Sequence, residues 1–302
     1  ATTIPFYIYY SMFGFQRVGD LAWAAGDSQA RGFLLGATAG RTTLNGEGLQ
    51  HQDGHSHVQA GLIPNCVTYD PTYGYEVAVI VRDGLRRMYE ENESIFYYLT
   101  LMNENYQHPA LPEEKDIADQ IIKGIYKLES VIPKKKAKAN VQLMGSGTIL
   151  QKVREAAQIL SADYGISSDV YSVTSFNELA RDGQDVTRWN MLHPESKQRQ
   201  AYISSVITKE NGPAIAATDY IKSYSDQVRG FINTEYRCLG TDGFGRSDSR
   251  ANLRTHFEVN AAYIVVAALF ELANRGDIKR SVVTDAIKHF DIDTEKLNPL
   301  YA

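Results

Sequence analysis

The sequence predicts an α/β protein with two doubly wound domains, each a mostly parallel sheet with helices on both faces. Short apolar runs alternate with longer segments whose apolar residues recur at helical spacing, and this alternation occurs twice along the chain. A polar, charged stretch with two prolines separates the two series, at 104–120. The 302 residues suffice for two ordinary domains. We therefore expect a first domain at 1–120, connection included, and a second at 121–302.

The first series begins with the run at 4–10, which is apolar on both faces of a period-2 pattern. That pattern is typical of a strand buried on both sides, as in a parallel sheet. The strands that we expect after it lie at 32–36, 63–69 and 94–101, and the helices at 16–31 and 75–91.

The second series begins with an expected strand at 124–131. Ser175 is suited to cap a short helix at 176–181, because a serine hydroxyl can accept a hydrogen bond from a free helical N–H. The other strands are expected at 141–144, 169–173, 214–217 and 236–239, and the other helices at 150–164, 259–274 and 280–290.

Composition limits the classes of partner. The net charge of −5 argues against nucleic acid, and the lysines at 134–138 read as a solvated linker. The longest apolar stretch, 261–270, is too short to span a bilayer and predicts a buried helix rather than a membrane segment. Cys66 and Cys238 lie far apart and form no disulfide framework, so they are expected to be buried thiols of a cytoplasmic protein. Because the chain starts with Ala1 and a strand follows almost at once, we expect a piece of a longer protein.

The run from Gly40 to His57 is the best candidate for a functional loop. It holds three of the seven histidines, with one glutamate and one aspartate, and has little apolar content. Three interpretations stay open on residue types alone: a solvated loop, a polar site for an organic ligand, or a metal site. The possible metal ligands are His51, Asp53, His55 and His57.

Two aromatic residues, Tyr10 and Phe13, follow the end of the first strand. Parallel sheets bind ligands outside the carboxyl ends of their strands, so these rings could pack on a flat heterocycle. Two glycine-rich segments also follow strands. We expect a tight turn at 145–147, since Leu150 stands where a full phosphate-binding fingerprint needs glycine. We expect a long structural loop at 240–250, which has no P-loop lysine.

Four long strings of this sequence resemble the homodimeric, bacterial-type dehydrogenase component of the pyruvate dehydrogenase complex. The resemblance extends along the whole chain and is carried by residues 4–17, 40–57, 169–185 and 239–250. It implies a thiamine diphosphate enzyme with a transketolase-like build. The chain would then be the later part of a pyrimidine-binding domain, incomplete at its N-terminus, followed by a whole C-terminal domain.

The resemblance also implies the chemistry and the site. The enzyme would decarboxylate pyruvate and pass the acetyl unit reductively to a lipoyl-bearing dihydrolipoamide acetyltransferase. Tyr10 and Phe13 would lie against the aminopyrimidine ring, and Glu47 and His51 would reach into the substrate pocket. His51 would transfer a proton and stabilise charge, while Glu47 would help to orient the substrate. His55 and His57 would hold the loop rather than bind a metal.

Two features of this family are missing from the sequence. It has no Gly-Asp-Gly followed some thirty residues later by Asn, so the ligands of Mg²⁺ are expected on an N-terminal domain. The glutamate that activates the aminopyrimidine is expected before Ala1. We therefore expect the 302 residues alone not to bind the cofactor tightly and not to turn over pyruvate. The alternatives are a metal-dependent hydrolase built on His51, Asp53, His55 and His57, or a non-catalytic dimerisation module.

Overall fold

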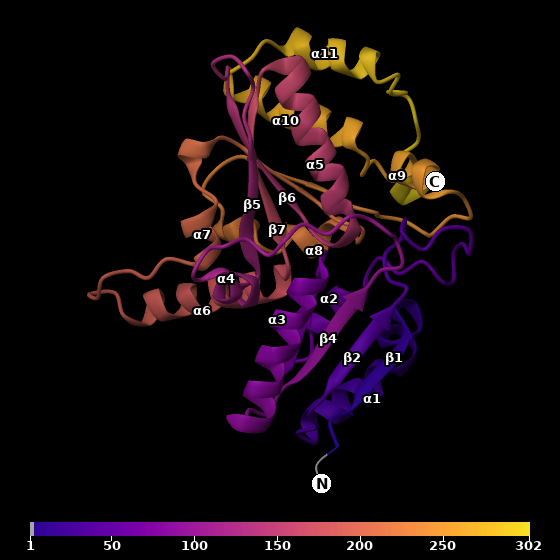
Figure 1. Ribbon diagram of the computed structural model, residues 1–302, viewed down its shortest axis with the longest axis vertical. Helices are drawn as coiled ribbons and strands as arrows, with labels where there is room; N and C mark the ends of the chain where they lie inside the picture. The colour runs from indigo at the N-terminus through magenta and orange to yellow at the C-terminus, as the bar shows by residue number, and fades with distance from the viewer. Residues whose placement is uncertain (1–2) are drawn as a thin grey trace.

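The computed structural model describes residues 3–302 and contains two sheets, one in each half of the sequence. Along the long axis of the molecule the first sheet lies below the second in Figure 1, and the chain ends near α9, beside the junction of the two. Helices cover both faces of each sheet, and each face has its own apolar core. The expected α/β class with two doubly wound sheets is therefore confirmed.

The first sheet is fully parallel, in the order β1-β2-β4-β3. Alternate residues of its central strand point to opposite faces: Phe96 and Tyr98 pack under α1 and α2, and Tyr97 and Leu99 pack under α3 and α4. Its elements are β1 (Phe6–Tyr10), α1 (Phe15–Asp27), β2 (Phe33–Ala37), α2 (Ser56–Gly61), β3 (Cys66–Tyr69), α3 (Gly74–Leu85), β4 (Phe96–Leu101) and α4 (Ile117–Lys123).

The expectation that the first strand is buried on both faces is wrong. Phe6, Tyr7, Ile8 and Tyr10 are 43 to 63% exposed, although the strand itself forms as expected. The reason is its position: β1 pairs only with β2 and is the edge of the sheet within residues 3–302. An all-apolar pattern identifies a strand, but it cannot tell which strand will lie at an edge.

The second sheet has the order β5-β7-β6-β8-β9, parallel except for β5, which runs antiparallel to β7. Its predicted strands all form. The elements are β5 (Ile125–Val131), β6 (Asn140–Gly145), α5 (Leu150–Ile159), β7 (Ser167–Val173), α6 (Phe176–Leu192), α7 (Tyr202–Val206), β8 (Ala214–Ala217), α8 (Lys222–Asp226), β9 (Tyr236–Leu239), α9 (Arg250–His256), α10 (Ala261–Arg275) and α11 (Arg280–His289).

Several helices differ from the prediction. Ser175 does cap α6 through a hydrogen bond from the Glu178 N–H, but this helix has 17 residues rather than six. The short helices α2, α4, α7, α8 and α9 were not predicted, since each spans too few residues to show a periodic pattern. Helix α4 also makes residues 117–120 of the expected connection helical. The domain boundary at residue 120 stays a prediction.

Helix α10 is the expected buried helix. Residues 250–275 are long and apolar enough to cross a membrane by composition, yet 61% of their most apolar window is buried inside the protein. That burial is typical of the core helix of a globular fold. Both thiols are buried and free, as expected.

Candidate functional site

An aromatic cluster lies at the carboxyl end of β1. A 3₁₀ turn follows the strand, so that Tyr10 and Phe13 lie with ring centroids 5.9 Å apart. The imidazole of His51 packs edge-on against both, 5.7 Å from Tyr10 and 5.0 Å from Phe13. Tyr10 is 43% exposed, so the cluster is open to solvent. Residues 38 positions apart or more are thereby brought together at the place where parallel sheets bind ligands.

Glu47 belongs to the same place. Its carboxylate lies 3.6 Å from Nδ1 of His51, and both side chains are partly exposed, at 42% and 24%. The two residues face each other because the backbone turns at Gly48, whose carbonyl oxygen accepts hydrogen bonds from the N–H groups of His51 and Gln52. Within residues 3–302, His51 Nδ1 is buried and makes no hydrogen bond. The structure thus assembles all four predicted site residues, and their chemical roles stay predictions.

The other polar residues of this loop do not converge on a metal. Asp53 is buried and accepts hydrogen bonds from the N–H groups of His55 and Ser56, at the start of α2. His55 Nε2 pairs with Gln16, whereas His57 Nε2 pairs with Thr100 on β4. Across residues 3–302 there is no group of three or more His, Cys, Asp or Glu side chains that could hold a metal ion. The metal-dependent hydrolase alternative therefore has no geometric support.

His57 is a buried structural residue. Its ring stacks on Tyr224 at 4.8 Å and meets the edge of Tyr220 at 4.9 Å, which ties α2 to the second half of the chain. Burial lowers the pKa of His57 to about 3, so the ring stays neutral at physiological pH.

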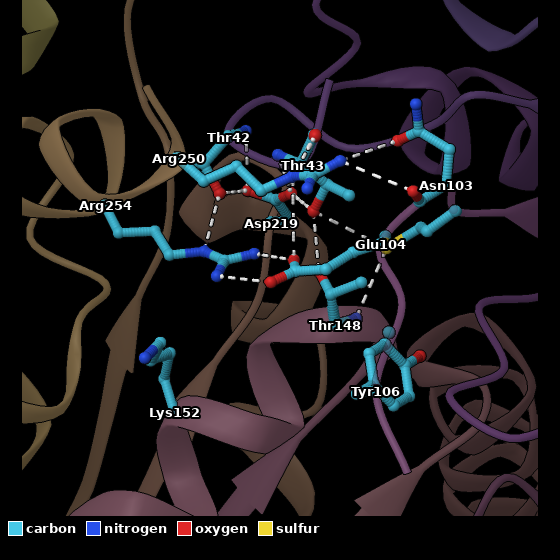
Figure 2. A network of polar contacts seen from close by, with 12 residues as sticks. Thr42, Thr43, Asn103, Glu104, Tyr106, Thr148, Lys152, Asp219, Arg250 and Arg254 are labelled. Atoms are coloured by element: carbon cyan, nitrogen blue, oxygen red, sulfur yellow. Dashed lines mark hydrogen bonds and ion pairs between the residues drawn. The ribbon is translucent and has the colours of Figure 1, made fainter. Parts of the chain in front are cut away.

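A second polar region, which sequence analysis missed, joins the two sheets (Figure 2). Asp219 follows β8 and is fully buried. Its two carboxylate oxygens accept hydrogen bonds from the N–H and hydroxyl groups of Thr42 and Thr43, at 2.6 to 3.0 Å. Arg254 of α9 donates to the Thr42 hydroxyl and forms a bidentate ion pair with Glu104. These contacts attach the start of the functional loop to the second sheet.

The approach of Asp219 requires a glycine at position 40. Gly40 has φ +89°, and a Cβ there would lie 2.3 Å from an Asp219 carboxylate oxygen. On the other side of the loop, Arg250 donates to the Thr43 carbonyl oxygen at 2.7 Å and reaches Asn103 (Figure 2). The side chains of Arg250 and Arg254 therefore bind protein groups.

Two more buried carboxylates cross the same junction. Asp70, after β3, accepts hydrogen bonds from Thr100 and from Ser146 in the 145–147 turn. Glu76 of α3 accepts from Tyr126 and Ser172 of the second sheet. Burial raises the pKa of Asp70 to about 7 and also raises the pKa of Glu76 above its ordinary value. A carboxylate within two residues of the end of a predicted strand was the available signal for Asp70 and Asp219.

The 145–147 segment is a tight turn in the junction, as expected: Gly147 has φ +51° and donates its N–H to the Asp70 carbonyl oxygen. The 240–250 segment is a long loop that lies against residues 44–52 of the same chain. The N–H of Gly46 donates to the Asp248 carbonyl oxygen, and the Ser247 hydroxyl donates to the Gly46 carbonyl oxygen.

Comparison with known proteins finds similarity along nearly the whole chain. Residues 1–109 match the family described as pyruvate dehydrogenase E1 component middle domain, and residues 124–260 match the transketolase-like C-terminal domain. The chain is 64% identical to the pyruvate dehydrogenase E1 component of Escherichia coli K12 over 301 residues, which is 99% of this chain and 33% of that protein. The Haemophilus influenzae and Pseudomonas aeruginosa proteins of the same name are 60% and 61% identical, each again over 33% of its length.

Solved structures with the same fold are transketolases. The Campylobacter jejuni enzyme has a TM-score of 0.63 at 18% identity, over 88% of this chain and 35% of its own. A transketolase mutant from Pichia stipitis has a TM-score of 0.66 at 18% identity, over 90% of this chain and 34% of its own. A split-gene transketolase described as an inactive β4 tetramer has a TM-score of 0.56 at 15% identity, over 90% of this chain and 77% of its own.

The chain spans about a third of the length of the curated relatives that it matches. The two family matches follow one another along the chain. The segment that aligns with these relatives includes the loop at 40–57 and the strand end at Tyr10. On this basis, the chain is similar to bacterial pyruvate dehydrogenase E1 components along nearly its whole length, and it has a transketolase-like fold.

Proposed function

We propose that this chain is part of an enzyme that decarboxylates pyruvate with thiamine diphosphate and transfers the acetyl unit reductively to a lipoyl group of the acetyltransferase partner. The observation that carries the proposal is the 64% identity to a pyruvate dehydrogenase E1 component over 99% of the chain. The open cluster of Tyr10, Phe13, Glu47 and His51 supports it, because a flat ring and a small oxo acid both fit such a set of side chains.

The residues present fit a heteroaromatic cofactor. Tyr10 and Phe13 are tilted by 56° to each other at the strand end, and the exposed Tyr10 ring offers a surface on which a planar heterocycle can pack. When bound, thiamine diphosphate supplies the carbon nucleophile and the electron sink that loss of CO₂ requires. We propose that Mg²⁺ and the diphosphate bind outside this chain, whose sequence lacks the Gly-Asp-Gly…Asn motif.

His51 and Glu47 would transfer protons and stabilise charge beside the reacting carbon. Glu47 lies on the Nδ1 side of the imidazole, so that Nε2 is the atom that would give a proton to the substrate or take one from it. The same imidazole, donating from Nε2, would stabilise negative charge that develops on the substrate oxygen. Glu47 would thereby fix the orientation of the ring as well as that of the substrate.

The experiment is to measure the complete enzyme that contains this chain. We expect CO₂ release from pyruvate that depends on thiamine diphosphate and Mg²⁺, together with acetylation of an added lipoyl domain. Replacing Tyr10 or Phe13 with Ala should raise the cofactor Kd by about 2- to 10-fold, the value of one aromatic contact. Tyr301→Ala, at an exposed ring near the C-terminus, serves as the control. Absence of CO₂ release from the wild-type enzyme would refute the proposal.

Calorimetric titration of the 302-residue chain alone, beside the complete enzyme, tests the division of the site. We propose that the chain alone neither binds the cofactor tightly nor decarboxylates pyruvate. Tight binding to it would mean that the diphosphate is held within these residues, and the loops at 40–57 and 240–250 would then be its first candidates.

We further propose that the complete enzyme is a cytoplasmic homodimer, as the family resemblance implies. The exposed apolar residues of β1 and α1, among them Tyr7, Ile8 and Trp23, favour burial against another surface. A native mass equal to a single complete chain would contradict this part of the proposal.

A further inference from the structure

The segment that carries Glu47 and His51 has little packing of its own. Its internal backbone bonds come from the turn at Gly48, and Glu47 is 42% exposed. What holds the segment is the loop at 240–250, which follows the last strand of the second sheet. We propose that Gln52 and Ser247 are positioning residues that hold Glu47 and His51 in their reactive arrangement through this loop. The inference rests on the proposed function.

Gln52, which we call the inner clamp, connects the segment to the loop at 240–250 through a buried side chain. It is fully buried and directly follows His51. Its side-chain amide donates to the Leu44 carbonyl oxygen at 2.7 Å, and its oxygen accepts the N–H of Arg246 at 2.7 Å. A Cβ on Gly245 would lie 2.7 Å from the same oxygen, so the close approach of the loop depends on a glycine there. One side chain thus closes the turn that contains His51 and ties it to the second half of the chain.

Ser247, which we call the outer clamp, connects the loop at 240–250 to the same segment from an exposed position. Its hydroxyl donates to the Gly46 carbonyl oxygen at 2.5 Å, and the N–H of Gly46 donates to the Asp248 carbonyl oxygen at 3.0 Å. Gly48 also packs against Ser247, whose Oγ would lie 3.4 Å from a Cβ on that glycine. Glu47 therefore sits between two glycines that both contact the loop. Within residues 3–302, neither side chain hydrogen-bonds to the side chain of Glu47 or His51, so both act through other residues.

The expected consequence is kinetic, because a displacement of about 1 Å can cost about 100-fold in rate. In the complete enzyme, Ser247→Ala should lower kcat by about 3- to 10-fold, Gln52→Leu by about 100-fold, and neither should change the Kd of thiamine diphosphate. Ser247→Thr keeps the hydroxyl and should restore activity. Hydrogen–deuterium exchange of the peptide 44–52 should become faster in Ser247→Ala and in Gln52→Leu.

The chain offers a matched control for each clamp. Gln142 is also fully buried and links separate segments, donating to the Thr208 and Gly212 carbonyl oxygens at 2.8 Å. Ser205, like Ser247, is exposed and donates to a backbone carbonyl oxygen. Gln142→Leu and Ser205→Ala should therefore lower the Tm by amounts similar to their counterparts while kcat stays at the wild-type value.

Equal losses of kcat in Gln52→Leu and Gln142→Leu, or unchanged exchange of the peptide 44–52 in Ser247→Ala, would overturn the positioning role. A wild-type enzyme that releases no CO₂ from pyruvate would instead refute the proposed function, and the exchange measurement would still decide whether the loop positions the segment.

Discussion

Two polar regions lie at the carboxyl ends of parallel strands in this chain, and they differ in how far their side chains are exposed. At the end of β1, Tyr10 is 43% exposed and Glu47 is 42% exposed. At the junction of the sheets, Asp219 is fully buried and accepts four hydrogen bonds from Thr42 and Thr43. Side chains of the open region are accessible to a ligand, whereas the Asp219 carboxylate of the closed region joins the two halves of the chain.

The comparison shows why residue types alone did not separate function from structure. Asp53 and His57 come from the same short loop as Glu47 and His51, and their side chains have similar chemistry. Asp53 and His57 are buried and bound to protein groups, whereas Glu47 and His51 are partly exposed. Exposure of the side chain therefore distinguishes the candidate site from the scaffold that supports it.

The largest effect should come from the open region and should be kinetic. In the complete enzyme, His51→Ala should lower kcat by about 10²- to 10⁴-fold, since it removes a general acid–base group. The cofactor Kd and the Tm should change little, because the side chain is partly exposed and donates no structural hydrogen bond. Steady-state kinetics and calorimetric titration measure both quantities. His55→Ala, in the same loop, is the control, and unchanged turnover in His51→Ala would refute the role.

The closed region should respond in stability instead. Asp219→Ala leaves the N–H groups of Thr42 and Thr43 and the Thr42 hydroxyl without their acceptor and should lower the free energy of unfolding by about 3 kcal/mol. Urea denaturation measures this. Asp119→Ala, which breaks an exposed pair with Lys123, should change it by no more than about 0.5 kcal/mol. Similar losses in both variants would mean that the junction is not the stabilising element we describe.

Asp70 gives the closed region a pH dependence. Burial raises its pKa from 3.8 to about 7, so the folded protein binds a proton in this interval that the unfolded chain releases. The contribution of Asp70 to stability is therefore full below its unfolded pKa and is lost as the pH rises through about 7. Asp70→Asn cannot titrate, so the variant should gain stability relative to the wild type as the pH is raised from 4.5 to 8. Parallel curves would contradict the raised pKa, and Asp119→Asn gives the baseline.

The smallest effect should come from a hydrogen bond in the open region. The side-chain oxygen of Gln16 lies 2.8 Å from His55 Nε2, and this hydrogen bond is exposed to solvent. Gln16→Ala should lower the free energy of unfolding by less than about 1 kcal/mol, since water replaces an exposed partner. A loss as large as that of Asp219→Ala would show that the open region is as rigidly built as the junction.

Much of the fold could be predicted from the sequence because local patterns determine it. Every predicted strand forms, and β8 and β9 have the predicted bounds. The reason is that short apolar runs between turns form strands in an α/β chain. The length of α6 could not be predicted, because beyond its capped first turn it is largely polar. The burial of β1 could not be predicted either, because strand order decides it.

The candidate site was predictable to a different degree. The composition of the loop at 40–57 and the position of Tyr10 and Phe13 after a strand marked the region, and the family resemblance selected Glu47 and His51 within it. Asp70, Asp219 and the clamp residues Gln52 and Ser247 were missed, since each has a partner in the other half of the chain. The sequence around a single Asp or Gln does not indicate a contact with a residue more than a hundred positions away.

By itself, the sequence determined the class of fold, the family resemblance and the residues from which a site could be made. Periodicity, turn residues and identity to relatives are properties of the chain read in order. Only the tertiary structure decided which of these residues are exposed to solvent and which are buried in the junction between the sheets. The physical reason is that burial and hydrogen-bond satisfaction depend on what packs against a residue, and here the packing partners of the 40–57 loop come from β4, α9 and the loop at 240–250.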